Sequence, residues 1–147
     1  MSTDLDIAGF RAAWESQVRG RVASSTRPLD VSAYPGSSPQ IPCVFLQRGV
    51  INYHGTMGVV GLTQSEWEMV LRVGGGADAD AHAAMDDYCA TSTDCSLPQA
   101  VEHDPTLGGV VGSLNVMSVS APVWFGDEQG RTWLEARFAM KLVKGSA

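Results

Sequence analysis

Four side chains of the kinds that bind zinc occur within one stretch of the sequence: His82, Cys89, Cys95 and His103. Imidazole and thiolate groups are the ligands that zinc prefers in proteins. The spacing, however, lacks the paired CxxC pattern of a zinc knuckle, and Cys89 falls on the apolar side of a predicted helix. We therefore expect no metal site and no cofactor, and we interpret Cys89 as a residue of the core.

A second chemistry suggested by residue types is hydrolysis, because His103 and Asp104 are adjacent. A serine nucleophile needs a strained turn such as GxSxG, and the sequence has none. No glycine run has the GxGxxG or GxxxxGK[ST] context of a phosphate-binding loop. Four carboxylates that are close in sequence belong to a predicted solvated helix face or to one side of a predicted strand: Asp86, Asp87, Glu66 and Glu68. The sequence thus predicts a protein that is not an enzyme.

The first element that the sequence predicts is an amphipathic helix from about Asp4 to Val22. Thr3 and Asp6 have the spacing of a capping box at its start, and Pro28 stops it. Apolar residues recur at helical spacing along it and define one stripe: Ile7, Phe10, Trp14, Val18 and Val22. We expect Trp14, like Trp67 further along the chain, to pack in the core.

Alternation of apolar and polar residues predicts five strands, at Leu29–Tyr34, Ile41–Gln47, Trp67–Val73, Leu114–Val119 and Trp133–Val143. Two shorter helices are expected between the third and fourth strands, one starting near Asp78 or Asp80 and one capped by Ser96. Each strand has one apolar face. We predict a single α+β domain over residues 1–147, with a mainly antiparallel sheet and two to three helices packed on one face.

Composition excludes some partners. The chain has 147 residues with 44% hydrophobic content, which is enough to bury a core, and a formal net charge of -6. An acidic chain without basic runs is not expected to bind nucleic acid tightly, because Lys and Arg supply most of that affinity. The apolar runs are shorter than the roughly 20 residues that span a bilayer. The N-terminus lacks the features of a secretory signal, so we expect no membrane partner and synthesis in a cytoplasm.

The stretch Arg48–Gln64 fits neither the helical nor the strand period for long, and it contains four glycines. We interpret it as a long mobile loop or an extended hairpin. Its apolar residues need a partner to cover them, so we predict a subunit-interface loop, with Tyr53 as the best anchor. The interface candidates are Arg48, Val50, Ile51, Tyr53, His54 and Met57.

The order of these motifs resembles the tail terminator family of long-tailed bacteriophages. In the first half, the likeness rests on Leu29–Tyr34, a Pro-rich turn, Ile41–Val44 and the strand Trp67–Gly74. In the second half it rests on the two short helices, on Trp133–Ala136 and on the segment Asp104–Gly109 in front of a strand. That last segment, with the pattern Asp-x-Thr-Leu-Gly-Gly, is the most specific motif. The resemblance covers most of the chain.

The resemblance implies a sheet backed by helices and a role in assembly. Six copies would form a hexameric ring on the last ring of tail tube protein, stop tube polymerisation, and present a surface to the head-completion or neck protein. The protein would then be found in the virion, at the head-proximal end of the tail, with DNA only passing through the lumen. Alternatives are a neck or head-tail connector subunit, a tail tube subunit, and a small hydrolase or metal enzyme.

Two of the three cysteines, Cys89 and Cys95, flank one short predicted loop. A virion spends its life outside the reducing cytoplasm, so a disulfide between them is one alternative. Two free thiols are the other, and we expect that state in freshly made protein.

Overall fold

The computed structural model describes residues 6–27, 29–35, 41–52, 63–74 and 78–144. Within this part of the chain, three helices and six strands follow in the order α1 (Ile7–Val22), β1 (Asp30–Ser32), β2 (Cys43–Asn52), β3 (Thr63–Gly74), α2 (Asp78–Cys89), α3 (Leu97–Glu102), β4 (Ser113–Val119), β5 (Val123–Gly126) and β6 (Thr132–Lys144). The strands form one sheet, and all their pairings except β1 with β2 are antiparallel. The predicted α+β class is therefore confirmed.

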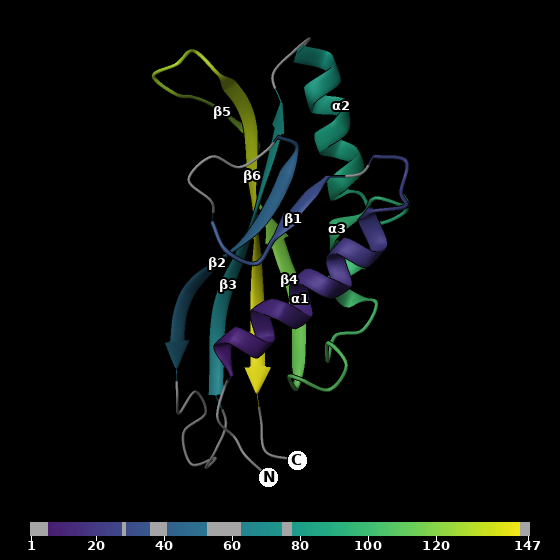
Figure 1. Cartoon of the computed structure of the whole chain (residues 1–147), viewed down its shortest axis with the longest axis vertical. Helices are drawn as coiled ribbons and strands as arrows, with labels where there is room; N and C mark the ends of the chain where they lie inside the picture. Colours follow the sequence, from purple (N-terminus) through teal and green to yellow (C-terminus); the bar gives the residue numbers. More distant parts are fainter. Residues whose placement is uncertain (1–5, 28, 36–40, 53–62, 75–77, 145–147) are drawn as a thin grey trace.

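The long strands β3 and β6 form the centre of the sheet, whose order is β1-β2-β3-β6-β4 (Figure 1). β5 also pairs with β6, beyond the end of β4, so the chain from Ser113 to Gly126 follows β6 as one broken strand. At the break, the Ser120 amide donates to the Arg137 carbonyl at 2.9 Å, and the Arg137 amide donates to Ser120 Oγ at 3.0 Å. From the sequence, no strand is predicted between Leu114–Val119 and Trp133–Val143, so β5 is a strand that sequence reasoning missed.

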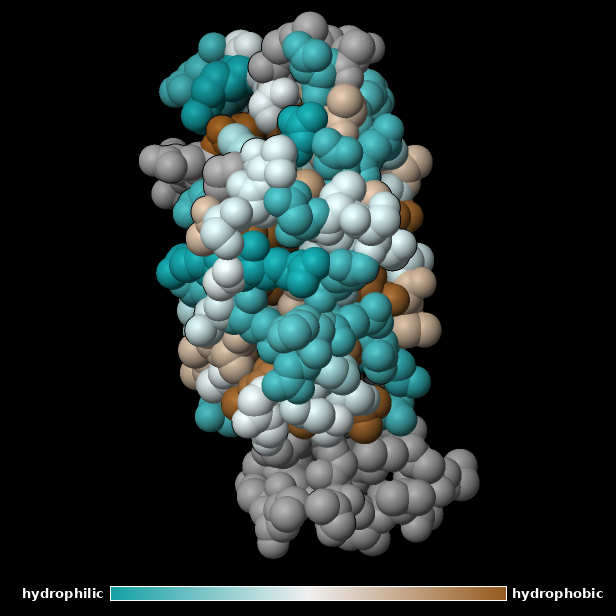
Figure 2. Space-filling model, turned by 90° about the vertical axis from the view of Figure 1, so that its right-hand side faces the viewer, coloured by the Kyte–Doolittle hydropathy of each residue, from teal (hydrophilic) through white to brown (hydrophobic). Residues whose placement is uncertain are grey.

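All three helices lie on the same side of the sheet (Figure 1). The core between helices and sheet contains Trp14 and Trp67, which are almost completely buried as predicted, and the rings of Phe10 and Trp67 meet edge to face at 4.7 Å. Burying each such side chain contributes about 1.5–3 kcal/mol. The helix side of the molecule is mostly hydrophilic on its outside (Figure 2). Helix packing on one face, as predicted, leaves the other face of the sheet without a helical layer.

Helix α1 begins later than predicted, at Ile7 rather than Asp4, because Asp6 itself caps it. The Asp6 carboxylate accepts the Gly9 amide at 3.0 Å, which satisfies one of the free donors at the helix start. The helix also ends at Val22, well before Pro28. The predicted apolar stripe is confirmed, since four of its five residues are fully buried and Ile7 packs against the core.

Arg11 attaches α1 to the edge of the sheet. Its Nη1 atom donates to the carbonyls of Ala33, just after β1, at 2.5 Å and of Leu46, in β2, at 3.2 Å. The guanidinium also lies over the rings of Tyr34, at 4.4 Å, and Trp67, at 5.0 Å. Burial lowers the pKa of Arg11 from its usual value. This side chain supplies donors to the β2 edge at the point where the short strand β1 stops pairing with it.

The predicted loop Arg48–Gln64 is shorter than expected. β2 continues to Asn52 and β3 begins at Thr63, and the two strands pair through Ile51 with Ser65 and Asn52 with Gln64. The mobile-loop interpretation is therefore wrong for these residues, and the hairpin alternative describes them. A β-bulge between Arg48 and Ile51 absorbs the irregular residues that break the alternation in the sequence. The rest of the predicted loop, residues 53–62, lies outside the described residues.

The motif Asp104–Gly109 folds into a compact turn with three successive residues at positive φ. Leu107 has φ 50° and is buried in the core, and Gly108 and Gly109 follow with φ 73° and 91°. A leucine in this conformation is strained by about 1–2 kcal/mol. The Asp104 carboxylate holds the turn, accepting the Thr106 hydroxyl at 2.7 Å and the Gly108 amide at 2.9 Å.

The outer edge of β4 is occupied by the chain that precedes it. The amide of Leu114 donates to the Pro105 carbonyl at 2.8 Å, and the amide of Val116 donates to the Glu102 carboxylate at 3.4 Å. Met117 follows as the extra residue of a bulge in the pairing of β4 with β6. Bonded amides and a bulge are two of the ways in which proteins protect an edge strand from further pairing.

We predict that Asp104 makes the fold sensitive to acid. Its hydrogen bonds from Thr106 and Gly108 lower the pKa of Asp104 below its usual value. Its stabilising contribution is therefore present above about pH 4, the ordinary aspartate range, and is lost as pH falls through the lowered value. In urea unfolding at a series of pH values, Asp104→Asn should lose less stability on acidification than the wild type. Equal losses in both proteins would contradict the prediction.

Candidate functional site

The face of the sheet opposite the helices, here called the open face, carries six charged side chains on its two central strands. Three lie on β3 and three on β6, and they are Glu66, Glu68, Arg72, Glu135, Arg137 and Lys141. Successive residues of a strand point to opposite faces, so these positions alternate with the core residues on the same strands. Charged residues in the middle of a sheet need neighbours that satisfy their hydrogen bonds.

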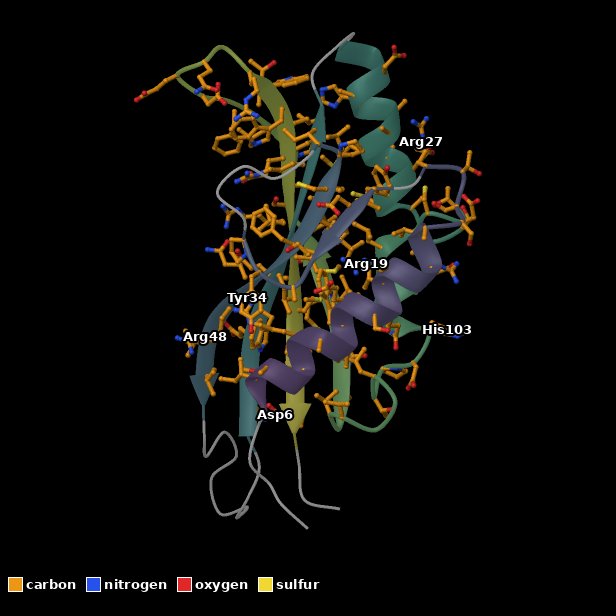
Figure 3. The ribbon with its side chains drawn as sticks, viewed as in Figure 1. Asp6, Arg19, Arg27, Tyr34, Arg48 and His103 are labelled. Atoms are coloured by element: carbon orange, nitrogen blue, oxygen red, sulfur yellow. The ribbon has the colours of Figure 1, made fainter. Side chains whose placement is uncertain are left out.

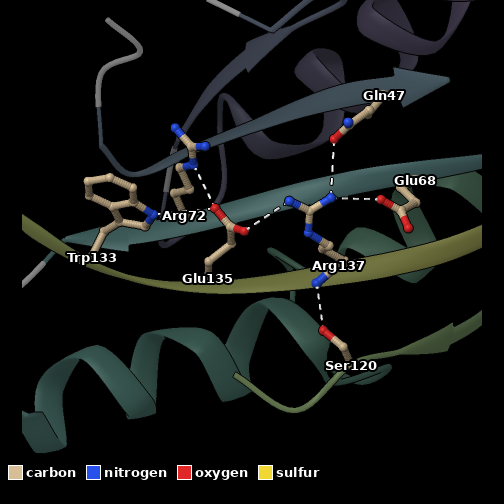
Figure 4. Close-up of polar contacts among 7 residues, drawn as sticks. All are labelled: Gln47, Glu68, Arg72, Ser120, Trp133, Glu135 and Arg137. Atoms are coloured by element: carbon tan, nitrogen blue, oxygen red, sulfur yellow. Dashed lines mark hydrogen bonds and ion pairs between the residues drawn. The ribbon is translucent and has the colours of Figure 1, made fainter. Parts of the chain in front are cut away.

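Glu135 is the centre of a polar network on the open face (Figure 4). It is only 5% exposed, and its carboxylate accepts hydrogen bonds from Arg72 Nε at 2.9 Å, Arg137 Nη2 at 3.3 Å and Trp133 Nε1 at 3.3 Å. Two of these donors are charged, which makes the bonds stronger than neutral ones. The network therefore fixes the side chains of both arginines and of Trp133.

Arg137 extends the network to the neighbouring strands. Its Nη1 atom donates to Glu68 on β3 at 2.9 Å and to the Gln47 side chain on β2 at 3.2 Å (Figure 4). The hydrogen bond to Glu68, together with the charge of Glu135, raises the pKa of Arg137. The side chains of four residues on three adjacent strands are thus joined across the open face.

Arg72 lies between two aromatic rings. The centre of its guanidinium is 5.0 Å from the ring of Phe45 on β2 and 5.0 Å from the ring of Trp133 on β6. Trp133 is in turn stacked with the exposed ring of Phe125 on β5, at 6.4 Å and an interplanar angle of 17°. An arginine held by rings and by a carboxylate is already ordered before any partner arrives.

A groove of about 480 Å³ lies next to the network on the open face. Its lining includes residues of both β-bulges and of the central strands between them: Gly49, Val50, Met117, Glu66, Glu68 and Lys141. The apolar bulge residues Val50 and Met117 are 60% and 64% exposed. The groove is therefore a hollow with apolar and charged residues in its lining, which is a common composition for an interaction site.

Gly49 makes the bulge of β2 possible. A Cβ atom at this position would lie 2.5 Å from the carbonyl oxygen of Glu66 on the adjacent strand, which is too close for any side chain. The two residues Gly49 and Val50 together face the single residue Glu66, since the pairing shifts between Arg48 and Ile51. The glycine therefore sets the close approach of β2 to β3 beside the groove.

We predict that Gly49→Ala lowers the free energy of unfolding by about 1–3 kcal/mol, because the backbone must move to make room for the methyl group. Gly20→Ala is the matched control. Gly20 lies in α1, and no atom outside its own helix backbone lies within 4 Å of the place that a methyl group would take, so alanine there should stabilise the helix by about 0.5–1 kcal/mol. Urea unfolding of both variants checks that the free energy of unfolding falls in Gly49→Ala and rises in Gly20→Ala. A Gly49→Ala protein as stable as the wild type would contradict the steric argument.

The predicted interface residues are only partly brought together. Val50 lines the groove, but Arg48 and Ile51 pair with Trp67 and Ser65, whose side chains are on the helix side of the sheet. Arg48 lies at the outer margin of β2 (Figure 3). The other three candidates, Tyr53, His54 and Met57, lie outside the described residues.

Several residues of the open face are not predicted as site residues from the sequence. The alternating pattern marks Arg72, Glu135 and Arg137 only as the wetter side of their strands, and Met117 only as part of a strand. The nearest signal in the sequence is a pair of tryptophans, Trp124 and Trp133, on the two sides of the glycine-flanked segment Gly126–Gly130, since Trp133 belongs to the network. Arg72 and Glu135 are 63 residues apart in sequence, so their pairing leaves no local pattern to detect.

Cys89 and Cys95 are free thiols in the structure, as is Cys43. Cys95 is buried, and its sulfur lies 3.8 Å from the Thr93 hydroxyl oxygen. Burial raises the pKa of Cys89 to about 11, so its reactive thiolate form is rare at neutral pH. In this structure both side chains belong to the packing around α2 and α3.

The residues considered for catalysis or metal binding are not assembled into a site. His103 is exposed at the end of α3 and points away from the fold (Figure 3), and the carboxylate of Asp104 is engaged within its own turn. In the described ranges, no three His, Cys, Asp or Glu side chains form a group that could hold a metal ion. None of the described helices is both long and apolar enough to cross a membrane.

Comparison with known protein families and with curated proteins gives no match to this chain. The open face, with its groove and its network, is therefore the best-supported candidate for a functional site. Its chemistry is that of a binding surface, because it combines exposed apolar residues with charged side chains whose positions are fixed.

We predict that the two carboxylates bound by Arg137 differ in their effect on stability. Removing Glu135 leaves Arg72 and Trp133 without their acceptor at a position that is almost inaccessible to solvent. Glu135→Ala should therefore destabilise the fold by about 2 kcal/mol. Glu68→Ala is the control. Glu68 is partly exposed, and its ion pair should contribute less than about 1 kcal/mol. Equal losses in urea unfolding would show that Glu135 does not organise the face.

Proposed function

We propose that this protein is a structural subunit that assembles into a ring, of the tail terminator type that closes a bacteriophage tail tube. The observation that carries the proposal is the open face, where a groove with exposed Val50 and Met117 adjoins a fixed network of charged side chains. Exposed apolar residues around such a hollow mark surfaces that bind another protein. A binding role in assembly needs no reacting group, and the open face offers the apolar and charged contacts that such a role uses.

The two sides of the sheet support a ring rather than a symmetric pair. A ring joins two different surfaces of each subunit, so that every copy has one free surface of each kind until the ring closes. The helices cover one side of the sheet (Figure 1), whereas the open face carries the groove and the polar network. The likeness of the motif order to tail terminators agrees with this role, with tail tube protein and a neck protein as further partners.

The test is the mass of the native assembly and its dependence on the groove. Wild-type protein should form closed rings, with six copies as the expected number. Val50→Ser together with Met117→Ser should leave a folded monomer, because each buried apolar side chain contributes about 1.5–3 kcal/mol to a contact. The concentration needed for assembly should then rise at least about tenfold. Circular dichroism checks that the helix content is unchanged.

A matched control is Val119→Ser, an exposed valine outside the groove lining, which should assemble like the wild type. Closed rings of normal stability from the groove variant would contradict the assignment of the open face as the contact. Wild-type protein that grows into long polymers would instead indicate a tube subunit. Rings that do not bind the end of a tail tube would indicate a neck connector.

A further inference from the structure

The charges of the chain are distributed unevenly along the sequence. Between Arg72 and Arg131 there is no Lys or Arg, but there are nine Asp and Glu residues. The rest of the chain carries a formal net charge of +3. The acidic stretch includes α2 and α3, which contain five of these carboxylates, Asp78, Asp80, Asp86, Asp87 and Glu102. A surface of one sign is suited to a partner surface that offers the other.

Helix α2 presents this charge on one outer face. Asp80, Ala83 and Asp86 are exposed and follow one another at intervals of three residues, which places them on one side of the helix. The opposite side is buried in the core through Ala81, Ala84, Met85 and Tyr88. Because Ala83 is small, the outer face of α2 allows a partner to approach closely between the two carboxylates.

The orientation of α2 is fixed by contacts with the segment after α1. The Tyr88 hydroxyl donates to the Arg27 carbonyl at 3.0 Å, and Arg27 Nε is 2.6 Å from Asp87 Oδ2. The neighbouring carboxylate of Asp87 is thereby already paired, whereas Asp80 and Asp86 have no ion pair among the described residues. These two carboxylates are the ones that remain for a partner.

On the open face, Arg72 has donors of the matching kind. Its Nε atom is used by Glu135, and its side chain is 23% exposed between the rings of Phe45 and Trp133. Figure 4 shows the bond from Nε to Glu135, and within the described part of the chain the two terminal nitrogens of Arg72 have no hydrogen-bond partner. A planar guanidinium held in this way can bind a carboxylate through both terminal nitrogens with little further loss of side-chain entropy.

We propose that the open face of one subunit binds the outer face of α2 of a second copy, with Arg72 receiving a carboxylate from Asp80 or Asp86. The inference rests on the proposed function, because it assigns the two surfaces that meet between ring neighbours. The surfaces lie on opposite sides of the sheet, so each subunit uses one of them with each neighbour, as a closed ring requires.

The outer face of α1 fits this role less well than that of α2. It presents Arg19 and Arg21, which offer no carboxylate to Arg72, and its Glu15 is already paired with Arg19 at 2.7 Å. The unused terminal nitrogens of Arg72 therefore favour α2, with the carboxylates of Asp80 and Asp86, as the surface that docks on the open face of a neighbouring copy.

The test uses two variants that each lack one surface. Arg72→Gln removes the charged fork but still offers a donor to Glu135, and Asp80→Lys with Asp86→Lys reverses the charge of α2. Each variant alone should need at least about tenfold more protein to assemble than the wild type. Mixed in equal amounts, they should form one-to-one dimers in native mass spectrometry and no rings. Each dimer would use the intact open face of the α2 variant and the intact α2 of the other.

Glu128→Lys is the control, because it reverses an exposed charge of the same acidic stretch in the turn after β5. It should assemble normally. If Arg72→Gln does not fold, Val50→Ser with Met117→Ser replaces it as the variant that lacks the open face. If the wild-type protein forms rings but the two variants stay monomeric when they are mixed, this inference alone is overturned. If the two variants form one-to-one dimers on mixing but the wild-type protein never forms closed rings, the proposed function is overturned and the contact is supported.

Discussion

The carboxylate of Glu135 organises the side of the sheet that no helix covers. Its three donors come from β3 and β6, and one of them, Arg137, connects onward to β2 and to the break between β4 and β5. The open face has only a small buried apolar cluster, formed by Cys43, Phe45 and Val70, whereas the helix side has the main core. On the open face, the ion pairs of Arg72 and Arg137 with Glu135, and of Arg137 with Glu68, join the two central strands. The groove and the aromatic contacts of Arg72 both depend on this order.

The helices were the most predictable part of the structure. The stripe from Ile7 to Val22 and the cap at Ser96 are local patterns, and the structure retains both because packing agrees with them. Asp6 replaced the predicted start of α1, since a carboxylate directly before the apolar stripe is in the right place to cap it. Local patterns succeeded wherever the determining contacts were made within one helical turn.

The strands were harder to predict where pairing was irregular. The four residues of β5 are all exposed, so they show no alternation of buried and exposed positions, and only their pairing with β6 defines the strand. The extra residues Val50 and Met117 of the two β-bulges also interrupt the alternation of buried and exposed positions along their strands. The candidate site consists largely of these irregular positions and of charges paired between distant strands. Such features are determined by tertiary contacts, which a single sequence does not display.

The protected edge of β4 has a consequence for how copies of this protein can associate. An open edge strand can pair with a strand of another copy, and a sheet that is extended in this way can grow without limit. With Leu114 and Val116 already bonded to the preceding chain, β4 offers no such continuation. In the proposed ring, contacts through the broad faces would let side-chain packing set the angle between neighbours and bring the last copy back to the first. For contacts of that kind, the size of an assembly is a property of the subunit's shape.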